Sequence, residues 1–235
     1  MRSGTIGARS FSLIELHRAG AAAIIGLFFA LPPAVGLAVP AEGGADSPAA
    51  GALRALIAQD FANCSRVRRP PPDNPAKAAA NCRADGFAAA PDDKLAAVAR
   101  ARADYLRLLV AHSPSGCAAA LVHTDADGPP PSGRLQAASY NVTMAMTAAS
   151  VAGETAPMRR RPPSPDDWRF VRDGMVARGV RPADAGASIQ GRLDAIAVAA
   201  RCRVRIAQYD VIASAPGPVA GRIIAPESKA LRYPE

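Results

Sequence analysis

The stretch Pro91–Gly116, PDDKLAAVARARADYLRLLVAHSPSG, indicates the fold class most clearly. It opens with a proline and two acids, residue types that suit the first turn of a helix. From Leu95 to Leu109, apolar residues recur at spacings of three or four, which places them on one face of a helix. The pattern ends at Ser113, just before a second proline. A helix of about six turns with one apolar face has to pack against other helices, so the stretch predicts a helical bundle.

Weaker helix signals lie on both sides of this stretch. Ser164, followed by a proline and two acids, repeats the start pattern, and Asp184 stands where it could cap a further helix. A helix that begins after Asn74 is expected to end before Gly86. The predicted helices cover approximately residues 47–65, 75–85, 92–112, 134–152, 165–177 and 184–200.

Three segments fit a strand as well as a helix. In residues 134–152, Tyr140, Val142, Met144 and Met146 alternate as in a strand, while the alanines favour the helix that we predict there. Cys117–His123 is short and apolar, and Arg201–Ala207, RCRVRIA, alternates arginine with Cys, Val and Ile. We predict a mostly α fold, an irregular helical bundle stapled by disulfides. The alternative is a small α+β fold with a strand pair near the C-terminus, which requires a strand over about 201–212.

The amino terminus has the three parts of a secretory signal peptide. Residues 1–18 carry three arginines and one acid, and Ala19–Leu31 is a run of thirteen residues without a charge. Small residues follow, so cleavage is expected after residue 38 or 41. As a helix the run would span about 20 Å, less than a bilayer core of about 30 Å. We interpret residues 1–41 as a signal peptide; an uncleaved anchor stays open if the helix continues through the paired prolines that follow the run.

The remaining residues, 42–235, are expected to form a single exported helical domain. Two segments rich in arginine and proline, at 66–75 and 158–165, separate groups of predicted helices, and we interpret them as linkers. The expected location is the bacterial periplasm or the outside of the cell.

Four cysteines follow the signal peptide, and their number supports the same location. An even count in an exported chain is typical of a disulfide framework. Four cysteines allow three pairings. We favour Cys64 with Cys82, which lie on successive predicted helices across a proline turn, and Cys117 with Cys202.

Basic residues outnumber acidic ones by 28 to 20, which gives a formal net charge of +8. The arginines are scattered among acids, and aromatic residues make up only 5% of the chain. Proteins that bind nucleic acid usually combine a basic stripe with aromatic side chains for stacking, so we expect no nucleic-acid partner. The expected partner is an unidentified protein or envelope component, with membrane contact only through the N-terminal segment.

Two histidines outside the signal peptide bracket a cysteine, in the order His112, Cys117, His123. Imidazole and thiolate groups bind zinc and copper, so this cluster suggests an alternative role as a metal-binding protein or periplasmic hydrolase. The spacing matches no known ligand motif, and Cys117 is a disulfide candidate. The sequence therefore predicts neither a metal nor another cofactor.

Motifs for catalysis are not evident. The segment around Ser188 departs from the nucleophile motif G-x-S-x-G, because its second glycine comes one place late. Dinucleotide, P-loop and haem motifs are absent from the sequence. The adjacent acids at 92–93 and 166–167 are explained by the dipoles of the helices that they start. We therefore predict a non-catalytic binding protein.

Overall fold

The computed structural model describes residues 48–66, 75–121 and 133–232. In chain order, its α-helices are α2 (Pro48–Arg66), α3 (Pro75–Ala88), α4 (Asp92–His112), α5 (Pro114–Ala120), α6 (Gly133–Thr155), α7 (Pro165–Ala177), α8 (Pro182–Ile189), α9 (Val198–Ser214) and α10 (Gly217–Ile224). Two short 3₁₀ helices, η1 (Leu193–Ala195) and η2 (Ala225–Leu231), complete the set. No strand occurs in these ranges, so the predicted mostly α fold is confirmed and the α+β alternative is wrong. The predicted signal peptide, residues 1–41, lies outside the described residues.

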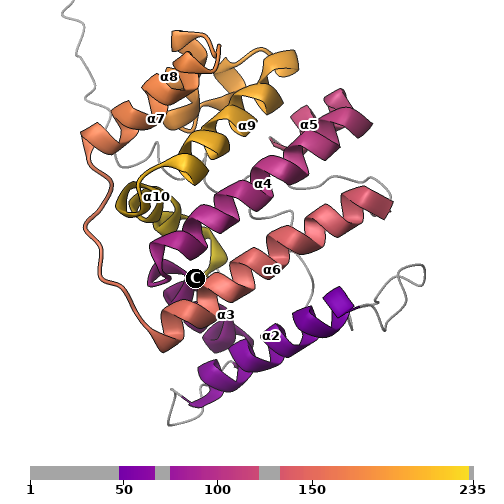
Figure 1. The fold of residues 1–235 in the computed structure, drawn as a ribbon, viewed down its shortest axis with the longest axis vertical. Helices are drawn as coiled ribbons and strands as arrows, with labels where there is room; N and C mark the ends of the chain where they lie inside the picture. The colour runs from indigo at the N-terminus through magenta and orange to yellow at the C-terminus, as the bar shows by residue number, and fades with distance from the viewer. Residues whose placement is uncertain (1–47, 67–74, 122–132, 233–235) are drawn as a thin grey trace, which may run out of the picture.

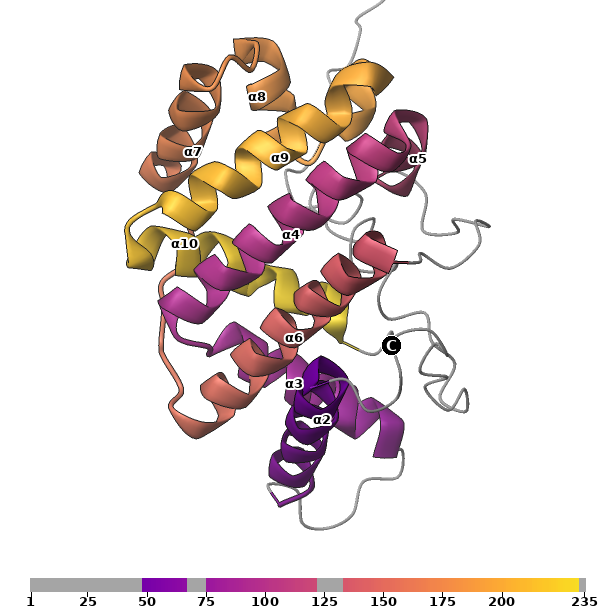
Figure 2. The ribbon, with the colours of Figure 1, turned by 45° about the vertical axis from the view of Figure 1, so that its right-hand side comes forward.

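Helix α4, predicted from Pro91–Gly116, is the central element. It lies between α6 and α9, and α10 also packs against it (Figures 1 and 2). Its apolar face is buried, with Leu95 and Val98 fully inaccessible to solvent. His112, three residues after Leu109, is exposed because the helix ends there and leaves the core.

The segment Arg201–Ala207 belongs to α9 and not to a strand. The strand interpretation took every arginine to face solvent. In the structure Arg205 is buried, and its guanidinium lies 5.6 Å from the centre of the Tyr209 ring. An arginine on the buried face of a helix produces an alternation that resembles a strand pattern. Cys117–His123 likewise begins within a helix, α5.

Helix α3 continues through Gly86 to Ala88, so the predicted end before Gly86 is wrong. Gly86 is there for packing: a Cβ at this position would lie 2.6 Å from the carbonyl oxygen of Ser150 on α6. On α6, Gly153 faces the carbonyl oxygen of Gly86 in the same way. Two glycines facing each other let α3 and α6 cross in close contact.

Helix α7 starts as predicted, with Ser164 as N-cap in a reciprocal capping box with Asp167. The predicted cap of α8 is wrong: the N-cap is Arg181, and Asp184 lies in the first turn, where Arg181 donates to it at 2.8 Å. Asp167 and Asp184 both lie in the first turn of their helices, where an acid is favourable. Of the two predicted caps, Ser164 and Asp184, only Ser164 occupies the N-cap position.

The arginine- and proline-rich segment after α6 runs along the outside of the bundle to α7 (Figure 1). It is fastened to the start of α4. The backbone nitrogen of Met158 donates to the carbonyl oxygen of Ala89 at 2.8 Å, and Nε of Arg160 donates to Asp92 at 2.8 Å. The other predicted linker, 66–75, lies almost wholly outside the described residues.

Both cysteine pairs that we favoured lie at disulfide-bonding distance. Cys64–Cys82 joins α2 to α3, with 5.7 Å between the Cα atoms, and Cys117–Cys202 joins α5 to α9, with 6.3 Å. Among the described helices, none is both long enough and apolar enough to cross a bilayer.

Candidate functional site

Polar and sulfur-containing side chains gather where α2, α3 and α6 meet, at the end of the bundle that carries α2 (Figure 2). The set, which we call the disulfide–carboxyl cluster, consists of Asp60, Cys64, Cys82, Arg83, Ser150 and Glu154. Each helix contributes two of these residues. On α2 and on α6 the two are four positions apart, which puts them on the same helix face.

Asp60 is the fixed charge of the cluster, and only 1% of its surface is exposed. Arg83 contacts it twice, through Nε at 2.8 Å and through Nη2 at 2.7 Å. The hydroxyl of Ser150 donates to the other carboxylate oxygen at 3.1 Å. Through these contacts the buried carboxylate of Asp60 holds the three helices together.

Glu154 lies against the disulfide. Its Oε1 is 3.2 Å from Sγ of Cys64 and 3.9 Å from Sγ of Cys82, and the Ser150 hydroxyl is 3.3 Å away. Its Oε2 is buried and has no hydrogen-bond partner within the described part of the chain. A carboxyl group with one oxygen unsolvated and unpaired is poorly prepared to carry a negative charge.

The pKa of Glu154 is raised above its ordinary value. Burial is the largest cause, and the negative charge of Asp60 acts in the same direction. Hydrogen bonds from Asn63 and Ser150 and the positive charge of Arg83 oppose this shift without cancelling it. Glu154 therefore retains its proton to a higher pH than an exposed glutamate.

The two sulfurs and a Glu154 oxygen all lie within 4.8 Å of one another. In the disulfide form neither sulfur is a thiolate, which is the form of cysteine that binds metals. The cluster as it stands is thus a disulfide beside a carboxylic acid, and it offers no metal-ligand set.

Of the alternative histidine–cysteine site, the structure describes only His112 and Cys117. His112 is exposed at the end of α4, and Cys117 is fully buried and paired with Cys202. His123 lies outside the described residues. Since Cys117 is taken up by a disulfide, it supplies no thiolate to a metal.

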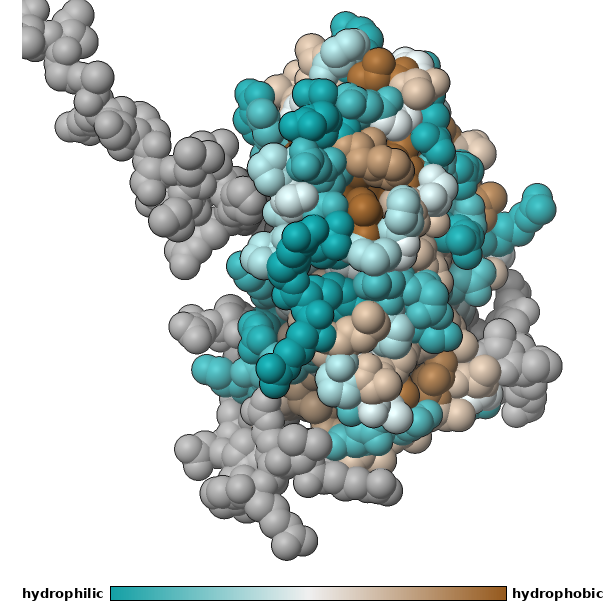
Figure 3. Space-filling view, turned by 60° about the vertical axis from the view of Figure 1, so that its left-hand side comes forward, coloured by the Kyte–Doolittle hydropathy of each residue, from teal (hydrophilic) through white to brown (hydrophobic). Residues whose placement is uncertain are grey.

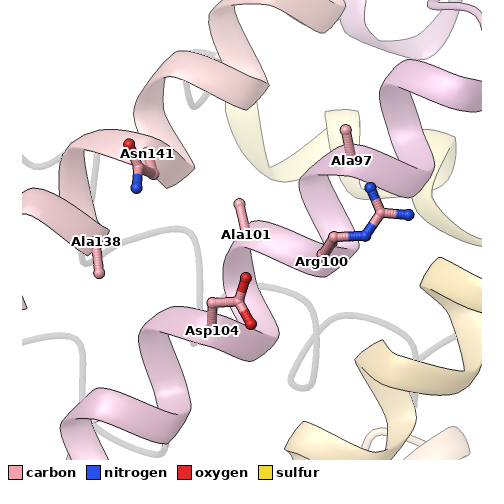
Figure 4. Close-up of a pocket in the computed structure, with 6 residues that line it drawn as sticks. All are labelled: Ala97, Arg100, Ala101, Asp104, Ala138 and Asn141. Atoms are coloured by element: carbon pink, nitrogen blue, oxygen red, sulfur yellow. The ribbon is translucent and has the colours of Figure 1, made fainter. Parts of the chain in front are cut away.

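A shallow groove of about 170 Å³ lies between α4 and α6 (Figure 4). Three alanines form most of its wall, and its polar side chains are those of Arg100, Asp104 and Asn141. Pockets for small ligands usually hold about 300–1,000 Å³. The groove is therefore too small to enclose a substrate of ordinary size.

A second buried polar network joins α4 to the C-terminal helices. Arg102 is 4% exposed and forms an ion pair with Glu227 of η2, and its guanidinium lies 5.6 Å from the Tyr209 ring centre. Gln208 accepts from Arg205 at 2.7 Å. Burial by itself would lower the pKa of Arg102. The electrostatic interactions and hydrogen bonds with Glu227 and Tyr209 raise it by more than burial lowers it, so the guanidinium stays charged. This network faces the core and serves to connect helices.

The sequence prediction included the cysteines of the site but missed Asp60 and Glu154. A weak signal was present: Asp60 lies one helical turn before Cys64, and Ser150 lies one turn before Glu154. Such spacings are too common to single out a site without knowing which helices meet. Comparison of the chain with protein-family models, with curated proteins and with solved structures gives no match.

Proposed function

We propose that the protein is exported and acts outside the cytoplasm as a non-catalytic binding protein of the bacterial periplasm or cell exterior. The observation that carries the proposal is that all four cysteines lie in pairs at bonding distance, tying α2 to α3 and α5 to α9. Disulfides of this kind persist in oxidising compartments and are rare in the bacterial cytosol. The signal-peptide pattern of residues 1–41 supports the same location.

The use of polar side chains supports binding over catalysis. The strongest buried ion pairs join helix to helix: Asp167 of α7 accepts from Arg222 of α10, and Arg102 of α4 pairs with Glu227 of η2. The groove between α4 and α6 is too small for a typical substrate. A protein of this construction offers its outer surface to a partner, and not a deep pocket to a small molecule.

The outer surface fits a polar contact with such a partner. Hydrophilic residues extend across the face that includes α7, and hydrophobic residues appear there only as small separate groups (Figure 3). The large hydrophobic side chains that are exposed are spread over α6, α7, α9 and the segment before α7, and they are Tyr140, Met158, Phe170, Val176 and Val198. Residues 42–235 carry 25 basic and 19 acidic residues, a formal net charge of +6, so we expect acidic groups on the partner to speed association.

The proposal is tested on the full chain expressed in a bacterium. Cytoplasmic, periplasmic and secreted fractions are treated with a thiol-alkylating reagent without reductant, and intact masses are measured. We expect the protein outside the cytoplasm, without residues 1–38 or 1–41, with no alkylated cysteine and no bound metal. Crosslinking in intact cells should join it to another envelope component.

Three results would contradict the proposal. A full-length chain in the cytoplasm with alkylated cysteines would remove the export argument. A bound zinc or copper ion in the native mass would favour the histidine alternative. A protein that crosslinks to nothing under any growth condition would remove the binding role.

A further inference from the structure

We propose that Cys64–Cys82 is an exchangeable disulfide that reacts with thiols, and that Glu154 supplies the proton which this exchange requires. The proposal goes beyond the binding role above, because it assigns a chemical activity to one of the two disulfides. It also stands independently of that role, since the reaction can be measured on purified oxidised protein wherever the protein resides.

The first argument is the contact between Glu154 and Cys64. A sulfur in a disulfide carries no hydrogen and is only a weak acceptor. The separation of 3.2 Å between Oε1 and Sγ is therefore a hydrogen bond only when the carboxyl group carries the proton and donates it to sulfur. In its protonated form, Glu154 thus places a proton beside the sulfur that has to accept one when the disulfide opens.

The second argument is the contrast with the other disulfide. Cys117 and Cys202 belong to the hydrophobic core, with 0% and 5% of their surfaces exposed. Cys64 and Cys82 lie outside that core among polar side chains, with 7% and 8% exposed. Helix α2, which carries Cys64, packs mainly on α3 and α6 among the described elements, at the end of the bundle (Figures 1 and 2). All four cysteines are buried, so what distinguishes the first pair is its polar surroundings and the carboxyl group of Glu154 beside it.

The reaction is thiol–disulfide exchange with a thiol, RSH, as reductant. A thiolate attacks Sγ of Cys82, a mixed disulfide forms, and Sγ of Cys64 leaves with the electron pair of the broken bond. Glu154 transfers its proton to this sulfur and is re-protonated by solvent. A second thiolate then attacks the mixed disulfide, releasing RSSR and the Cys82 thiolate, which takes a proton from solvent. In total, two RSH are oxidised to RSSR and the cysteine pair is reduced to two thiols.

Cys64 is the leaving sulfur because it is nearer to the acid, at 3.2 Å against 3.9 Å for Cys82. The charged groups facing Glu154 are Asp60 from α2 and Arg83 from α3. Burial and Asp60 raise the pKa of Glu154 and Arg83 lowers it, with a net increase. The proton is thus available at a higher pH than from an exposed glutamate and is lost as the pH rises through this pKa.

The first experiment compares the two disulfides in the unmodified protein. Oxidised full-length protein is mixed with excess reduced glutathione, quenched by alkylation at intervals, and each cysteine is quantified by peptide mass spectrometry. We expect Cys64–Cys82 to open at least about a hundredfold faster than Cys117–Cys202, in line with the smallest typical effects of a positioned acid. Divided by the glutathione thiolate concentration, the rate for Cys64–Cys82 should fall as the pH rises. Equal rates for the two disulfides would overturn the proposal.

The second experiment removes the proton donor. In E154Q the side chain keeps its size but cannot release a proton, so we expect a rate about a hundredfold lower and a flat pH profile. The control is D85N: Asp85 lies on α3, three residues after Cys82, and its side chain is 53% exposed. This variant changes the charge equally and should keep the original rate and profile. An E154Q protein with the original rate and pH profile would refute the role of Glu154. If E154Q does not fold, the proposal is decided by the first experiment, which compares the opening rates of the two disulfides in the unmodified protein.

Discussion

The crossing of α3 and α6 leaves no room for a side chain at Gly153, and one methyl group is enough to test it. A Cβ at this position would lie 2.7 Å from the amide nitrogen of Ala90 and closer still to the carbonyl oxygen of Gly86. Both atoms belong to the backbone, so no side chain can rotate away to make space. G153A should therefore force α3 and α6 apart.

We expect G153A to lower the free energy of unfolding by about 2 kcal/mol. Overpacking costs about 1–3 kcal/mol, and an obstacle made of backbone places the cost at the upper end. Alanine recovers about 1 kcal/mol at most through its higher helix propensity. The matched control is G186A in α8, where a Cβ would meet nothing within 4 Å. Only the propensity gain applies there, so the two variants should differ by about 3 kcal/mol.

The assay is urea unfolding followed by far-ultraviolet circular dichroism, with both disulfides intact. For a slope of about 2 kcal/mol per molar urea, the midpoint of G153A should fall by about 1 M and that of G186A should rise slightly. A G153A protein as stable as the original, beside a G186A protein that behaves as expected, would refute the close crossing. The position of Glu154, the next residue on α6, would then be in doubt as well.

Two further predictions concern long-range connections. Arg222 donates to the buried carboxylate of Asp167, and the N-cap residue Ser164 donates to it as well. These hydrogen bonds hold the pKa of Asp167 well below its usual range, although burial acts in the opposite direction. The pair therefore contributes fully above about pH 4, the ordinary pKa of an aspartate, and its effect is lost gradually as the pH falls from there through the lower pKa of the folded state. D167N should cost about 3 kcal/mol in urea unfolding at pH 7 and roughly 1 kcal/mol less at pH 3. Replacing Cys117 and Cys202 together by alanine opens a loop of 85 residues and should cost about 4.5 kcal/mol in the same assay, against about 3 kcal/mol for the other disulfide, whose loop has 18. Equal losses for the two disulfides, or a D167N penalty that does not change with pH, would contradict these values.

The helix starts and the main apolar stripe were predictable because they depend on neighbouring residues. The capping box of Ser164 and Asp167 needs only a spacing of three, and the stripe from Leu95 to Leu109 needs only the helical period. The errors came where a helix is enclosed by others. The alternation around Arg205 resembled a strand, but this arginine is buried against Tyr209 in a helix. Gly86 resembled a helix end, but it lies inside α3, where the backbone of α6 passes too close for a side chain.

In the candidate site, too, the features set by the local sequence were predictable and the contacts between distant helices were not. Its cysteines were expected, because an even number of them behind a signal-peptide pattern indicates disulfides. The acid beside them was not, since Glu154 lies 90 residues from Cys64 along the chain. The two meet only because α6 returns past α2 and α3. Sequence spacing describes a contact within a helix and carries no information on which helix faces it.

The amino-acid sequence by itself determined that this chain forms helices, where most of them begin, and which faces are apolar, because capping and the 3.6-residue period are local effects. The tertiary structure decided which polar groups share a buried space. Facing glycines at 86 and 153 bring α3 and α6 into contact, and this places a carboxyl group against one disulfide and leaves the other in an apolar core. Proximity of this kind sets protonation and reactivity, because both depend on the charges and the solvent around a group in space.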